Sequence, residues 1–92
     1  MNPSLEARNA ELGKRYGLTG PQVRVLAILG AYADRGAGEG SVASAMWGSA
    51  IHYRRALEML RTLHHKGFVT PDAPGGWRVT DTGKAPFSDD LS

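Results

Sequence analysis

The 92-residue sequence predicts a mainly helical α+β fold, with three to four helices followed by a two-stranded β-hairpin. The strongest helix signal lies in residues 51–68, where apolar and charged side chains separate onto opposite faces at helical spacing. Two short β-prone runs, residues 68–70 and 77–80, then flank a segment dense in turn residues. With 41% hydrophobic residues, the chain suits one domain with a single modest core.

The amino-acid composition excludes several classes of protein for this chain. Because the chain has no cysteine, it can form neither a disulfide framework nor a thiolate metal site. No apolar run approaches the roughly 18 residues of a membrane span, and the first residues lack the features of a secretory signal, so we expect a soluble cytoplasmic protein without membrane partners. The net charge of +2 is small, but Arg54, Arg55, Arg61 and Lys66 cluster in one predicted helix, whereas Glu6 and Glu11 lie near the start of the chain and Asp89 and Asp90 in its tail. A phosphate-binding face requires such a distribution.

A first helix is predicted for residues 4–16, with Ser4 as its N-cap and Lys14 and Arg15 near its end. Its large apolar side chains are Leu5, Leu12 and Tyr16. A helix with so narrow a stripe needs a partner, which is either the rest of the domain or the same helix of a second subunit. Residues 1–17 are therefore assigned to packing or dimerisation.

A second helix follows, with Thr19 or Gly20 as N-cap and Pro21 at an early helical position. Residues 23–33 are almost all apolar, so we expect this helix to be buried on most sides at the centre of the core. Residues 35–40 contain three glycines but lack the Gly-Lys-Ser/Thr of a phosphate loop, so a flexible turn is expected there.

A helix-turn-helix is predicted next. Ser41 is expected to cap a short helix that ends at Trp47, and the tight turn 48–50 leads into the helix of residues 51–66, which Gly67 ends. The predicted core face of this second helix holds Tyr53, Ala56, Leu57, Leu60, Leu63 and His64. The predicted outward face holds Arg54, Arg55, Glu58, Thr62, His65 and Lys66.

The C-terminal third is expected to pack a hairpin on the helices through Val69 and Val79, because an isolated hairpin is marginally stable. Residues 81–85 then suit one final helical turn that Pro86 stops. Residues 86–92 are predicted to be a polar, acidic and frayed tail.

Three segments resemble stretches of the multiple-antibiotic-resistance regulator (MarR) family. Leu18–Leu26 is similar to its "L-T-x-x-Q-x-x-x-L", Leu60–Val69 to its "L-x-x-L-x-x-K-G-L-V", and Val79–Ala85 to its "L-T-x-x-G-x-A". The resemblance implies a minimal winged helix-turn-helix domain over residues 18–85. The family's long C-terminal dimerisation helices and acidic-arginine wing tip have no counterpart here, so no small-molecule effector is expected.

This resemblance implies a sequence-specific double-stranded DNA-binding protein, a nucleoid-associated transcriptional regulator of the repressor type such as occurs in bacteria and phages. A homodimer is expected, because one small module offers few contacts and palindromic half-sites multiply them. The alternative is a winged-helix module for protein–protein interaction or assembly, without operator specificity.

The predicted base contacts lie near the start of the long helix. Arg54 and Arg55 can donate bidentate hydrogen bonds to guanine O6 and N7. Glu58 has two interpretations: it accepts from cytosine N4, or it pairs with a neighbouring arginine for about 0.2–0.5 kcal/mol, and we favour the pairing. Ser49 and His52, at the turn, are expected to touch a phosphate or base edge, with a cap as the alternative for Ser49. The predicted DNA-binding set is completed by Arg61, Thr62, His65, Lys66 and Arg78.

Other chemistry is not expected. No nucleophile, base and orienting group occur at a recognisable spacing, so we predict neither an enzyme nor a cofactor. His52 and His64 stand about 18 Å apart on a helix, so no metal site is predicted. Trp47 and Trp77 could stack on bases or pack in the core, and Trp77, in the hairpin, is the better candidate for stacking.

Overall fold

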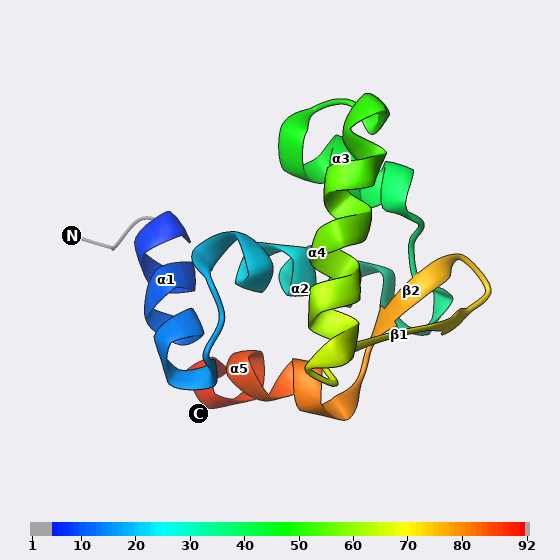
Figure 1. Ribbon diagram of the computed structural model, residues 1–92. Coiled ribbons are helices and arrows are strands. Elements are labelled where there is room, and N and C mark those ends of the chain that lie inside the picture. Colours follow the sequence, from blue (N-terminus) through cyan, green and yellow to red (C-terminus); the bar gives the residue numbers. More distant parts are fainter. Residues whose placement is uncertain (1–4, 92) are drawn as a thin grey trace.

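A computed structural model describes residues 5–91, and it confirms the predicted mainly helical α+β class. In chain order the elements are α1 (Leu5–Tyr16), α2 (Gly20–Tyr32), the 3-10 helix η1 (Ala33–Arg35), α3 (Glu39–Trp47), the 3-10 helix η2 (Ala50–His52), α4 (Tyr53–His65), β1 (Val69–Ala73), β2 (Gly76–Val79) and α5 (Asp81–Leu91). The central helix α2 contacts α4, with α1 and α5 at one end of the molecule and the hairpin at the other (Figure 1).

Helix α1 packs on α2 and α5 of its own chain, so the first of its two possible partners is the one observed (Figure 1). Leu12 is buried, and the Tyr16 hydroxyl donates a hydrogen bond to the carbonyl oxygen of Ala85 at 3.4 Å. The predicted N-cap, Ser4, lies outside the described residues. Pairing of α1 with a second subunit stays a prediction.

Helix α2 begins with a capping box at Thr19. The Thr19 hydroxyl accepts from the Gln22 backbone N–H at 3.2 Å, while Gln22 Oε1 accepts from the Thr19 N–H at 2.9 Å. The expected burial on most sides is wrong, because Ala27 and Ala31 are exposed and Tyr32 is 39% exposed. Alanine adds little apolar surface, so an alanine-rich face can remain in water at small cost. The buried side of α2 holds Val23, Val25, Leu26 and Leu29.

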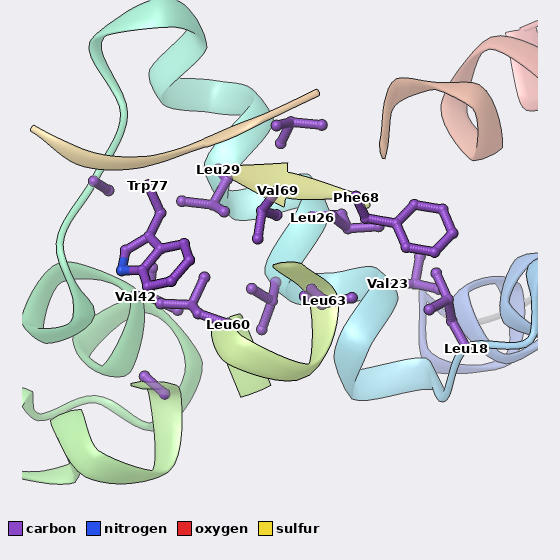
Figure 2. Close-up of a cluster of buried hydrophobic side chains, with 14 of the residues drawn as sticks. Leu18, Val23, Leu26, Leu29, Val42, Leu60, Leu63, Phe68, Val69 and Trp77 are labelled. Atoms are coloured by element: carbon purple, nitrogen blue, oxygen red, sulfur yellow. The ribbon is translucent and has the colours of Figure 1, made fainter. Parts of the chain in front are cut away.

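The core lies where α2, α4 and the hairpin meet. Figure 2 shows Leu26 and Leu29 of α2 gathered with Leu60 and Leu63 of α4, and all four side chains are fully buried. Truncating one such leucine to alanine typically costs about 2–5 kcal/mol. Val69 of β1 joins this cluster, so the hairpin packs on the helices as predicted (Figure 2).

The glycine-rich segment before α3 was expected to be a flexible turn, and this prediction is wrong because its backbone pairs with the hairpin. Ala37 and Trp77 exchange two backbone hydrogen bonds of 2.9 Å, and the Gly75 N–H donates to the Arg35 carbonyl oxygen at 2.7 Å. A Cβ atom at Gly36 would lie 2.5 Å from the Cβ of Ala73. Glycine is therefore needed here for close approach of the hairpin.

The start of α3 and the end of β1 also differ from the prediction. Helix α3 begins at Glu39 with Gly38 as its N-cap, so Ser41 lies inside the helix and does not cap it. Strands β1 and β2 are antiparallel with Val69 opposite Val79, but β1 continues through Pro71 to Ala73, where a turn was expected. Proline is tolerated in β1 because this strand is at the edge of a two-stranded sheet.

Helix α5 continues past Pro86 to Leu91, so the predicted stop and the frayed tail that follows it are wrong for residues 86–91. The Thr80 hydroxyl caps the helix by accepting from the Gly83 N–H at 3.2 Å. Pro86 lacks an N–H, but its ring is fully buried, and this burial offsets the missing hydrogen bond. Within residues 5–91, no helix combines the length and the apolar character needed to cross a bilayer.

Candidate nucleic-acid interface

The turn between α3 and α4 is built from local backbone signals. Gly48 takes a left-handed conformation (φ 80°) and ends α3, and Ser49 is extended. The Ser49 hydroxyl accepts from the Ile51 N–H at 3.3 Å, so Ser49 acts as a cap, as one of its two interpretations predicted. Residues 50–52 wind as the 3-10 turn η2, and α4 therefore begins at Tyr53, two residues later than predicted.

The predicted sidedness of α4 is confirmed at its centre. Ala56, Leu60 and Leu63 are fully buried, and Gly67, with φ 86°, follows the end of the helix. The exposed side chains are Arg54, Arg55, Glu58, Arg61, Thr62, His65 and Lys66. Four of these carry a permanent positive charge and one carries a negative charge. With 13 residues, α4 is about 20 Å long, and a helix of this diameter fits the DNA major groove.

The two arginines near the start of α4 are held by different aromatic rings. Arg54 Nε donates to the Tyr53 hydroxyl at 3.4 Å, and its guanidinium carbon lies 5.9 Å from the centre of that ring. The guanidinium carbon of Arg55 lies 4.5 Å from the ring centre of Trp47, at the end of α3. Tyr53 was predicted on the core face, but it is 46% exposed, because it opens the helix at the edge of the apolar stripe.

Glu58 does not make the predicted ion pair with a neighbouring arginine within residues 5–91. The reason lies in the aromatic partners, which direct Arg54 and Arg55 toward Tyr53 and Trp47. The Glu58 carboxylate thus stands exposed between cations, and the neighbouring Thr62 hydroxyl donates to the Glu58 backbone carbonyl at 3.1 Å.

The C-terminal part of α4 brings four predicted site residues together. Arg61, Thr62, His65 and Lys66 line one shallow depression on the surface. Lys66 Nζ also donates to the carbonyl oxygen of Gly17 at 3.2 Å, which ties the end of α4 to the turn after α1. His64, predicted on the core face, is exposed and meets the Trp77 ring edge-to-face with 5.8 Å between centres.

Arg78 in the hairpin forms an ion pair with Asp72, which was not predicted from the sequence. Arg78 Nε and Nη2 donate to the two carboxylate oxygens of Asp72 at 2.7 and 3.2 Å. The hydrogen bonds from Arg78 lower the pKa of Asp72, and those to Asp72 raise the pKa of Arg78. Because Thr70 lies opposite Arg78, Asp72 occupies a diagonal cross-strand position. This spacing is the signal in the sequence from which the ion pair could have been predicted.

Of the two tryptophans, Trp77 was the better candidate for stacking on a base, but the structure leaves only Trp47 accessible enough for that role. Trp77 is only 8% exposed, and its Nε1 donates to Glu39 Oε1 at 3.3 Å, so stacking of Trp77 on a base is excluded by its burial (Figure 2). Trp47 is half-buried, and its ring meets His52 edge-to-face with 6.1 Å between centres. Trp47 therefore belongs to the candidate interface, where it supports Arg55 and His52.

Two features of this face were not anticipated. Ile51, in η2, is 77% exposed, although isoleucine is usually buried. The second feature is a groove of about 430 Å³, which is lined by residues of α1, α2, α3 and α4 and has Arg24 and Arg55 as its cations. Arg24 lies on α2, far from α4 in the sequence, so only the fold brings these two cations to one groove. The part of the chain that the structure describes contains no group of three or more potential metal-ligating His, Cys, Asp or Glu side chains.

The candidate interface thus comprises the exposed side of α4, the turn before it and the hairpin, with cations in excess over acids. Comparison of the chain with protein-family models, curated proteins and solved structures found no match.

Proposed function

We propose that this chain is a winged helix-turn-helix domain that binds double-stranded DNA, with α4 as the recognition helix and β1–β2 as the wing. Arg54, Arg55 and Glu58 would meet base edges near the start of α4, and Arg61, His65 and Lys66 would lie near phosphates. Arg78 would contribute less than a free arginine, because Asp72 neutralises it.

One observation carries the proposal: the exposed side of α4 presents four permanent cations and a single acid, over a fully buried apolar stripe. Arginine and lysine attract the phosphate backbone, and a rigid helix positions them in a groove. The rings of Tyr53 and Trp47 limit the rotamers of Arg54 and Arg55, so less conformational entropy is lost when the arginines bind.

We further propose a transcriptional regulator, which as a homodimer would place two copies of α4 in successive major grooves, about 34–36 Å apart. In this arrangement each subunit reads one half of a palindromic operator. The apolar stripe of α1 already packs within its own chain through Leu12 and Tyr16. A dimer contact through α1 would therefore use the other side of that helix.

The experiment begins with selection of duplexes from a random library by the purified protein, followed by gel retardation with the selected duplex. The double variant Arg54→Ala, Arg55→Ala should bind about 30-fold more weakly or worse, from roughly 1 kcal/mol or more for each side chain. The charge-matched control is Lys14→Ala, Lys84→Ala, which removes two exposed cations from α1 and α5. Far-UV circular dichroism should show both variants folded.

The control should bind the selected duplex within about twofold of the parent. An equal loss of binding in the control and in the arginine variant would show that the effect comes from net charge alone. If the arginine variant binds as tightly as the parent, α4 is not the recognition helix. Equal competition by random and selected duplexes would favour the alternative, an assembly module without operator specificity.

A further inference from the structure

The turn that precedes α4 projects an apolar side chain into solvent. Ile51 is 77% exposed, more than any other large hydrophobic side chain among those described, and Tyr53 beside it is 46% exposed. We refer to Ile51, Tyr53 and Arg54 as the α4 tip. An exposed isoleucine leaves its apolar surface in water, so the tip gains free energy when another apolar group covers it.

The position of Ile51 is fixed by the turn and not by contacts of its own side chain. Its backbone N–H is bonded to the Ser49 hydroxyl, and the next residue, His52, packs against the Trp47 ring. Isoleucine is branched at Cβ and has few rotamers, so ordering it on binding costs little entropy. Ile51 is therefore a preorganised apolar contact at the leading end of the proposed recognition helix.

The surroundings of the tip indicate which partner covers it. Arg54 and Arg55 follow within one turn, and both are exposed. Such a mixed surface complements a polyanion that also presents an apolar group. In the DNA major groove that group is the C5 methyl of thymine, which Ala, Thr and Phe side chains are known to contact.

We propose that Ile51 is a specificity-determining residue that packs against a thymine methyl group, in the same groove where Arg54 meets guanine. This inference rests on the proposed DNA-binding function and adds a second base to what α4 reads. Ile51 and Arg54 are three positions apart, a rise of about 4.5–6 Å, and stacked bases rise about 3.4 Å. Selected operators should therefore carry a thymine within roughly one to two base pairs of the guanine.

The test replaces that thymine by deoxyuridine, which removes the methyl group and leaves the base pairing unchanged. Loss of one methyl contact should weaken binding of the parent protein about fourfold. Ile51→Ala should bind the thymine duplex about fourfold more weakly than the parent and should not distinguish thymine from deoxyuridine. Ile51→Val, which keeps a branched apolar side chain, should retain most of the discrimination.

Deoxyuridine at a thymine outside the selected half-site is the matched DNA control, and it should leave affinity unchanged. Parent binding that is indifferent to every such replacement overturns the inference, while the arginine-dependent selection above would still stand. Equal discrimination by the parent and Ile51→Ala also overturns it. A lower sedimentation mass of Ile51→Ala, with unchanged response to deoxyuridine, would assign Ile51 to a subunit contact instead. If no duplex is selected over random DNA, the proposed function and this inference fail together.

Discussion

The guanidinium of Arg55 lies over the ring of Trp47, with 4.5 Å between the guanidinium carbon and the ring centre. Trp47 is the last residue of α3 and Arg55 the third of α4, so this contact joins the two helices of the proposed DNA-reading unit. It also fixes where one of the two candidate base-reading arginines is presented.

A double-mutant cycle with Trp47→Leu and Arg55→Met should give a coupling free energy of about 0.5–1 kcal/mol, because the cation–π contact is near the surface. Urea unfolding of the four proteins measures it. The contact between Trp47 and His52 is lost in both Trp47→Leu variants and therefore cancels. Additive effects of the two substitutions would show that the ring and the guanidinium do not stabilise each other.

Gly83→Ala should destabilise the fold by more than about 1 kcal/mol. Gly83 lies in α5 against the hairpin, where a Cβ atom would collide with the Phe68 carbonyl oxygen and lie 2.6 Å from Val79 Cγ1. The matched control is Gly30→Ala in α2, where a Cβ atom meets nothing within 4 Å. Since alanine is the better helix former, Gly30→Ala should stabilise by about 0.5–1 kcal/mol. Urea midpoints measure both changes, and equal shifts would contradict the packing of α5 on the hairpin.

The Asp72–Arg78 pair should make a small contribution to stability that depends on pH. Because Arg78 lowers the pKa of Asp72 in the folded protein, the contribution is complete above the ordinary value of 3.8. It is lost as pH falls through the lower, folded-state pKa. Carbon-13 NMR titration of the Asp72 carboxyl should give a pKa below 3.8 in the parent and a pKa near 3.8 in Arg78→Gln. The same pKa in both proteins would mean that the pair does not persist in solution.

Arg61→Ala should reduce the salt dependence of DNA binding without changing which sequence is preferred. Each phosphate contact that is removed lowers the slope of log K against log salt concentration by about 0.9. Lys84→Ala removes an exposed cation of α5 and should leave the slope unchanged. Fluorescence anisotropy at four or five salt concentrations measures the slopes. A change in the preferred sequence would instead place Arg61 at a base edge.

The sequence by itself determined those features that depend on residues close together in the chain. The burial of Ala56, Leu60 and Leu63 followed from helical periodicity, because one turn returns side chains to the same face. Thr19 was recognisable as an N-cap candidate because its partner Gln22 is three residues away. The class of the fold was predictable for the same reason, since each element carries its own pattern.

Only the tertiary structure decided which distant residues meet. The pairing of Ala37 with Trp77 joins positions 40 apart. Through it, a segment expected to be a flexible turn and a tryptophan that was a candidate for base stacking become parts of the core. Pro86 is a helix breaker by local propensity, yet its burial keeps it within α5. Local patterns report the preferences of a segment, whereas these outcomes depend on surfaces that other elements supply after folding. The exposure of Ile51 belongs to this second group, because the turn that carries it packs on α3 and α4 in a way that leaves this side chain in solvent.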